Sequence, residues 1–199
     1  MAHKSHHLTH TILNTDSLEI KELAIKAGVD VPFLRPTSLG EDDVPVKDLI
    51  KWTAQWWEKE KGVLPDIVVT LQPTSPFRCV DHIDTTIQML RDNPEADSVI
   101  SVSKSIHTPY KMHVLQSSGY LKPLFSEQNV VQRQDAPVTY YPNGIVFVTR
   151  GSTLVSANNL WGEKALPYVL PEDVALNIDT QLEFDIAEYL YIRSKEIRN

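Results

Sequence analysis

A glutamine, a serine and an arginine lie close together in one short polar segment, as Gln72, Ser75 and Arg78. The segment follows residues 67–71, whose nearly continuous apolar sequence is typical of a strand buried on both faces of a sheet. Two prolines interrupt the segment and cannot donate to a sheet ladder, so we expect the strand to end near Gln72. Open α/β sheets bind ligands at the carboxyl ends of their strands. An amide, a hydroxyl and a cation at that place predict a site for a small anionic molecule.

The same residues also have interpretations that need no ligand. Gln72 could satisfy backbone groups of the loop, as buried polar side chains commonly do. Arg78 could pair with a surface carboxylate, an interaction that contributes little to stability.

The hydrophobic pattern predicts helices that alternate with strands. This alternation is typical of a three-layer α/β fold, in which a mostly parallel sheet carries helices on both faces, and the length suits a single domain over residues 1–199. We expect helices over residues 17–26, 46–61, 81–91 and 180–193, and strands over residues 11–14, 67–71, 97–103, 145–148 and 167–170.

One region departs from the alternation. Residues 109–125 read as a hairpin that turns at residues 117–119 (Ser-Ser-Gly), within an insert over residues 108–142. Such an insert could be a lid on its own subunit or a contact to a second copy.

Composition excludes several classes of function. The chain has 199 residues and a net charge of −7, so electrostatic binding of nucleic acid is not expected. No apolar run approaches the length of a membrane span, and no secretory signal is visible. The single cysteine, Cys79, forms no disulfide framework, which predicts a cytoplasmic protein. Cys79 makes no recognisable nucleophile–base pattern with His82, so packing is its favoured role.

The sequence gives little support for a glycine-rich phosphate site or for a histidine metal site. No two of the seven glycines lie close enough to form a phosphate-binding loop, and neither a Walker motif nor a dinucleotide fingerprint is present. Four histidines recur near the N-terminus, but a terminal turn is a poor platform for fixed metal ligands: His3, His6, His7 and His10.

Four segments together resemble the acylneuraminate cytidylyltransferase family, the CMP-sialic acid synthetases. The first is residues 71–78 (Leu-Gln-Pro-Thr-Ser-Pro-Phe-Arg). The others occur in the family's order: residues 13–17 leading to 31–36, residues 133–135 leading to 141–144, and residues 177–180 before the last helix. The resemblance covers residues 11–190, which is nearly the whole chain.

The resemblance implies a nucleotide-diphospho-sugar transferase-like, Rossmann-like fold. It also implies activation of a nonulosonic (sialic-type) 2-keto sugar acid with CTP and Mg²⁺, which gives the CMP-sugar and pyrophosphate for cell-surface polysaccharide biosynthesis. Sialic, legionaminic, pseudaminic and Kdo-type acids all remain open as substrates. The insert is expected to form a homodimer and to close over the partner's sugar site.

The resemblance assigns roles to particular residues. Asp179 with Asn177 would hold the metal, and Asp179 and Arg35 would act in catalysis. The expected substrate contacts are Gln72, Ser75, Arg78, Lys111, Arg133 and Asn143. Alternatives stand beside these roles: Asp179 suits a helix cap, Arg35 a brace for its loop, Asn143 a turn, and Lys111 and Arg133 solvated positions on the insert.

The chain also departs from the family's pattern. A first strand and its nucleotide-binding loop, roughly thirty to forty residues by the usual size of such a unit, have no counterpart. Asn177 replaces a usual aspartate, which predicts weaker metal affinity, and Phe147 stands where a tyrosine is frequent. The alternative function is therefore a catalytically impaired or truncated remnant that binds sugar acid or a partner subunit.

Overall fold

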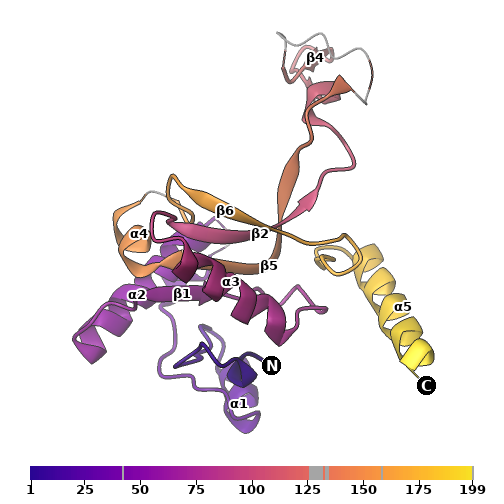
Figure 1. Ribbon diagram of the computed structural model, residues 1–199. Coiled ribbons are helices and arrows are strands. Elements are labelled where there is room, and N and C mark those ends of the chain that lie inside the picture. The colour runs from indigo at the N-terminus through magenta and orange to yellow at the C-terminus, as the bar shows by residue number, and fades with distance from the viewer. Residues whose placement is uncertain (42, 126–131, 133–134, 158, 199) are drawn as a thin grey trace.

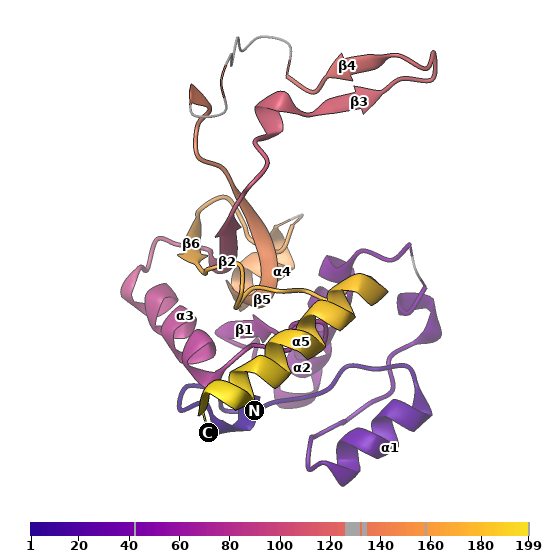
Figure 2. The same cartoon turned by 90° about the vertical axis from the view of Figure 1, so that its right-hand side faces the viewer.

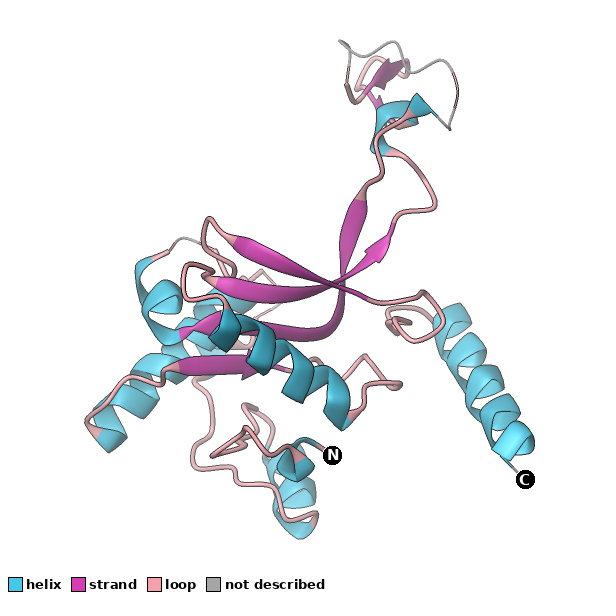
Figure 3. Ribbon diagram, in the orientation of Figure 1, coloured by secondary structure: helices cyan, strands magenta, loops and turns pink. Residues whose placement is uncertain are grey.

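The computed structural model describes residues 1–41, 43–125, 132, 135–157 and 159–198. At its centre is a four-stranded sheet in the order β1-β5-β2-β6 (Figures 1 and 3). Its strands are β1 (Ile67–Thr70), β2 (Ser98–Lys104), β5 (Tyr140–Arg150) and β6 (Ala165–Val169). β2 and β6 pair in parallel, whereas β5 is antiparallel to both β1 and β2. The predicted α/β class is confirmed, and the sheet is mixed, since β5 alone runs against the other three strands.

The main core lies between this sheet and α3 (Val80–Asp92). α3 buries Ile83, Ile87 and Leu90, whose spacing of four and three residues puts them on one helical face. They pack in one cluster with Val99 of β2 and Val146 of β5. Ile100 and Phe147, which directly follow Val99 and Val146, point the other way, as the two-residue period of a strand requires, and form a second cluster with Val102, packed against Trp161.

The pairing of β2 with β5 shifts its register between Ile100 and Val102. At the shift, the Ser101 hydroxyl accepts a hydrogen bond from the Val146 backbone N–H at 2.9 Å. A side chain thereby takes the place of a ladder carbonyl, as a buried N–H group requires. Beyond the shift β5 continues to Tyr140, so it is longer than the predicted strand over residues 145–148.

The N-terminal part contains η1 (Ala2–Lys4), α1 (Leu18–Lys26) and η2 (Thr37–Leu39). α1 begins as predicted, because the Ser17 hydroxyl accepts from the N–H of Ile20. The strand predicted over residues 11–14 does not form, and Ile12 makes only an isolated parallel bridge with Asp30. A single bridge cannot maintain a strand, and the prediction of this strand was therefore wrong.

Two further helices lie beside the sheet. α2 (Val46–Lys61) has the bounds predicted from its periodicity, and it contacts α4 (Gly151–Ser156), which directly follows β5. The aromatic ring of Phe33 packs edge-on against Trp52 and Trp56 of α2, with centroids 4.9 and 4.6 Å apart. These contacts tie the N-terminal part to the rest of the chain.

Two elements project from the sheet (Figures 1 and 2). The first is an arm in which η3 (Pro109–Lys111) precedes the hairpin β3 (His113–Leu115) and β4 (Leu121–Pro123), turning at Gly119 as predicted. The second is α5 (Gln181–Arg198), which stands away from the sheet and exposes much of its apolar surface: Leu182, Phe184, Ile186, Tyr189, Tyr191 and Ile192. Across the described ranges, no helix is both long and apolar enough to span a bilayer.

Candidate functional site

Two distant segments converge on one glycine, Gly144 in β5. Gly144 has a φ of +76°, a left-handed conformation that favours glycine. A β-carbon at this position would lie 2.7 Å from Gln72 Oε1 and 3.5 Å from both Ser75 Oγ and Asn177 Oδ1. Gln72 and Ser75 follow β1, and Asn177 precedes α5. The structure therefore brings together three of the predicted site residues at the carboxyl end of β1.

Hydrogen bonds fix this convergence. The Ser75 hydroxyl donates to the Gly144 carbonyl at 3.0 Å, and Ser75 is only 4% exposed. The Thr74 hydroxyl donates to Asn177 Oδ1 at 2.5 Å, and the Ile178 N–H donates to the Thr74 carbonyl at 2.9 Å. The loop after β1 and the segment before α5 are thus joined directly, although a hundred residues of sequence separate them. No pattern in the sequence predicted the contact between Thr74 and Asn177.

Asp179 is not the cap of α5. The Thr180 hydroxyl accepts from the Glu183 N–H at 3.3 Å, while Glu183 Oε2 accepts from the Asp179 N–H at 2.9 Å. These reciprocal contacts form a Thr-x-x-Glu capping box, a pattern that was visible in the sequence. The N–H of Asp179, followed by the Thr180 hydroxyl, lowers the pKa of Glu183. Capping by Thr180 and Glu183 leaves the Asp179 carboxylate exposed for another role.

The Asp179 carboxylate meets Asn177. Asn177 Nδ2 donates to Asp179 Oδ2 at 2.7 Å, so the amide group holds the carboxylate, while Asn177 Oδ1 accepts from Thr74. Mg²⁺ prefers oxygen ligands and is commonly held by one or two carboxylates together with phosphates. The two residues fit such an ion, with one full negative charge between them. The described part of the chain contains no group of three or more His, Cys, Asp or Glu residues arranged for a metal.

Arg78 lies half-buried beneath the loop that it closes. Its guanidinium donates from Nη2 to the Gln72 carbonyl at 2.6 Å and to the Gly144 carbonyl at 3.3 Å, and from Nε to the Ile145 carbonyl. Burial lowers the pKa of Arg78 to about 10. Neither ion pair found among the described residues includes Arg78, so the surface pair considered from the sequence is not formed there.

Asn143 lies within β5 and not in a turn. It is 3% exposed, donates from Nδ2 to Ser103 Oγ at 3.0 Å and accepts from the Ile145 N–H at 3.3 Å. The Ser103 hydroxyl in turn donates to the Leu170 carbonyl at 3.0 Å. Asn143 is thus part of a buried polar network that links β5, β2 and the end of β6. A substrate contact by this side chain stays a prediction.

The remaining predicted residues lie elsewhere. Arg35 forms an ion pair with Asp16 at 2.8 Å, and its backbone N–H donates to Thr15, which is the geometry of a loop brace. Its Nε is buried without a hydrogen-bond partner. Lys111 is exposed in η3 of the arm. Arg133 lies outside the described residues, so its role also stays a prediction.

A cavity of about 640 Å³ opens at the foot of the arm, where β2 and β6 end. It adjoins the polar network of Asn143, because Leu170 belongs to both. Its lining combines one cation and one carboxylate with an apolar floor: Lys104, Ser105, Ile106, Val169, Leu170, Pro171 and Glu172. Such a mixture suits a polar ligand that carries an apolar substituent.

The sequence profile of the cytidylyltransferase family matches residues 1–166. The chain belongs to the cytidylyltransferase family. Within it, the chain is 25% identical over 173 residues to the N-acylneuraminate cytidylyltransferase of Streptococcus agalactiae serotype V, an alignment that covers 86% of this chain. It is 27% identical over 189 residues to the CMP-N,N'-diacetyllegionaminic acid synthase of Legionella pneumophila, with 93% of this chain covered. The resemblance inferred from the four motifs is confirmed.

The fold of this chain is that of a solved structure. A CMP:2-keto-3-deoxy-manno-octonic acid synthetase complexed with CTP superposes with a TM-score of 0.64 at 13% identity, over 98% of this chain and 85% of that one. The lengths differ among relatives. The chain spans 40% of the streptococcal protein and 79% of the Legionella protein.

Proposed function

We propose that this chain activates a nonulosonic (sialic-type) acid with CTP, giving the CMP-sugar and pyrophosphate. The observation that carries the proposal is the convergence of Gln72, Ser75 and Asn177 on Gly144, beside the Asp179 carboxylate. It supplies amide and hydroxyl groups for a sugar and oxygen ligands for a metal at one place. The named relatives act on N-acylneuraminate, N,N'-diacetyllegionaminic acid and pseudaminic acid, which supports this substrate class.

The reaction needs positioning and neutralisation of charge more than covalent help. A hydroxyl of the sugar acid attacks the α-phosphate of CTP in line and pyrophosphate leaves. Asp179 and Asn177 would hold Mg²⁺, which supplies positive charge to the phosphates when bound. Gln72 and Ser75 would orient the sugar acid by hydrogen bonds. Arg35 would meet the nucleotide, to which its guanidinium would supply positive charge.

Lys111 and Arg133 would recognise the carboxylate of the sugar acid from the arm.

We also propose that the protein is a cytoplasmic homodimer. The arm carries exposed Lys111 and Lys122, whereas α5 carries the acidic residues Asp185 and Glu188. Both elements expose apolar side chains away from the sheet, which supports contact between the arm of one copy and α5 of another. Sedimentation equilibrium would test this, and a monomer at micromolar concentration would refute it.

A second candidate function is a non-catalytic module that binds sugar acid. The observation that favours it is the engagement of Asn177, whose Oδ1 accepts from Thr74 and whose Nδ2 donates to Asp179. An amide held in this way adds no negative charge to a metal site, so only Asp179 would attract the ion.

Release of pyrophosphate from CTP, Mg²⁺ and a panel of N-acetylneuraminic, legionaminic, pseudaminic and Kdo acids tests the two functions. Release that depends on the sugar acid and disappears in Asp179→Ala would support the transferase. Binding of one of these acids by calorimetry, without release, would instead establish the module.

A further inference from the structure

Arg78 bonds only to backbone carbonyls in the contacts described, and these belong to two different strands. The Gln72 carbonyl lies where β1 ends, and the carbonyls of Gly144 and Ile145 lie in β5. β1 and β5 pair in register from Ile67 to Thr70, so their ladder has stopped before Gln72. The guanidinium therefore bridges the two strands just beyond the last ladder pair, where the backbone would otherwise separate.

This bridge adjoins the candidate site, because Arg78 bonds to the backbone of Gln72 and Gly144. Gly144 must approach Gln72 closely, since the space for a β-carbon is filled by Gln72 Oε1. The backbone of both residues is held by the same Nη2 group of Arg78, at 2.6 and 3.3 Å. The Ser75 hydroxyl shares the Gly144 carbonyl with it. A change in the position of the guanidinium would thus move both sides of the site at once.

Arginine suits this task better than lysine does. Its planar fork presents donors in fixed directions, whereas an ammonium is a compact point charge on a flexible stem. Burial lowers the pKa of Arg78 to about 10, which still leaves the group protonated at neutral pH. Because the ion pairs found among the described residues do not include it, its charge is not cancelled by a carboxylate there. That charge favours an anion at the adjoining site.

We propose that Arg78 is a positioning residue, which sets the backbone of Gln72 and Gly144 so that the Gln72 amide meets the sugar acid. In this role Arg78 acts through Gln72 and Gly144 and does not contact the substrate directly. The inference rests on the proposed function for its ligand, and its structural half can be tested separately.

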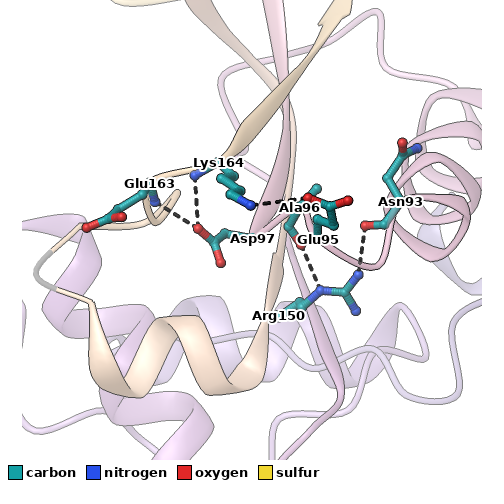
Figure 4. Close-up of polar contacts among 7 residues, drawn as sticks. All are labelled: Asn93, Glu95, Ala96, Asp97, Arg150, Glu163 and Lys164. Carbon is teal, nitrogen blue, oxygen red and sulfur yellow. Dashed lines mark hydrogen bonds and ion pairs between the residues drawn. The ribbon is translucent and has the colours of Figure 1, made fainter.

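The chain offers a matched control in Arg150 (Figure 4). Arg150 is also half-buried and also donates to three backbone carbonyls: from Nε to Ala96 at 2.8 Å, and from Nη2 to Leu90 at 2.9 Å and Asn93 at 3.1 Å. These carbonyls lie at and beyond the end of α3, away from the Gln72 loop. Arg150→Lys therefore removes the same kind of bridge without touching the site.

The experiment compares Arg78→Lys with Arg150→Lys in the full chain. We expect the KM for N-acetylneuraminic acid, or for whichever acid of the panel is the best substrate, to rise about tenfold in Arg78→Lys, the effect of losing one hydrogen bond to a charged group. The KM for CTP should change less than twofold, and Arg150→Lys should keep both constants. Equal kinetic effects in the two variants, or equal rises in both KM values in Arg78→Lys, would overturn the proposal.

Amide hydrogen exchange gives the second measurement, which needs no turnover. Arg78→Lys should accelerate exchange at least tenfold at the amides of Gln72, Thr74 and Ser75 and of residues 143–146, whereas Arg150→Lys should leave these amides unchanged. Unchanged exchange there in Arg78→Lys would overturn the positioning role. If the wild-type chain releases no pyrophosphate with any acid, the transferase function fails, and the exchange result alone decides whether Arg78 positions the loop.

Discussion

Replacement of Gly144 by alanine tests the central geometry of the site. The substitution has two separable consequences. A non-glycine residue at φ of +76° costs about 1–2 kcal/mol, and at ~2–4 °C per kcal/mol for a domain of this size the melting temperature should fall by about 2–8 °C. The new β-carbon would also lie 2.7 Å from Gln72 Oε1, which is too close for a carbon and an oxygen. The Gln72 amide must therefore turn away.

Gly62→Ala is the control, because Gly62 ends α2 at nearly the same φ, +75°, with no atom within 4 Å of its β-carbon position. The backbone cost should be common to both variants, so their melting temperatures should fall by similar amounts. Only Gly144→Ala should lose binding of the sugar acid, because only there is a ligand-binding amide displaced.

The magnitude follows from the loss of one hydrogen bond from Gln72, about 1 kcal/mol or roughly fivefold in affinity. Calorimetric titration with the sugar acid measures the affinity, and a thermal scan measures the melting temperature. Equal affinities in Gly144→Ala and Gly62→Ala would refute the claim that Gln72 and Gly144 form the site.

Three further predictions concern separate parts of the molecule. Asp179→Ala should abolish release of pyrophosphate and leave the melting temperature within ~2 °C, because the exposed carboxylate is not the cap of α5; near-normal turnover would contradict the metal role. Arg133→Ala should raise the KM for the sugar acid far more than that for CTP, whereas equal rises would indicate a general structural role. Asp97 accepts N–H groups of Lys164 and Glu163 at 2.9 and 2.8 Å, and these, in that order, lower its pKa (Figure 4). Because the folded pKa lies below the unfolded value, the carboxylate stabilises the fold above about pH 4 and this contribution disappears as the pH falls through the folded pKa. Asp97→Asn should thus be less stable than wild type by about 1 kcal/mol at pH 7 in urea titrations, with a difference that shrinks toward pH 3; a difference independent of pH would show that the charge of Asp97 is irrelevant.

Several elements could be predicted from the sequence because their signals are local. The bounds of α2 follow from its periodicity, and the start of α1 follows from Ser17, which caps it through a contact three residues away. The turn of the arm at Gly119 and the end of β1 near Gln72 are likewise set by neighbouring residues. The capping box of Thr180 and Glu183 is also local, because its two residues are three positions apart. Each of these features depends on backbone preferences within one or two turns of chain.

Local signals of this kind do not predict which strands pair in the sheet or in which direction they run. An apolar run predicts a strand but not its direction or its neighbour, so the antiparallel course of β5 and its extension to Tyr140 required the tertiary structure. For the same reason residues 11–14 have the composition of a strand and yet form only one bridge. A strand is stabilised by its partners, which the local sequence does not specify.

The candidate site likewise has some features that the sequence predicted and others that it did not. The types of its residues were read from motifs, so Gln72, Ser75, Asn177 and Asp179 were identified as candidates before their positions were known. The tertiary structure was needed to show that Gly144 provides the space for Gln72, that Thr74 reaches Asn177, and that Arg78 bonds to carbonyls and not to a carboxylate. Apart from the bond of Arg78 to the nearby Gln72 carbonyl, these contacts join residues 66 to 103 positions apart, and their geometry exists only once the sheet has brought the three segments together.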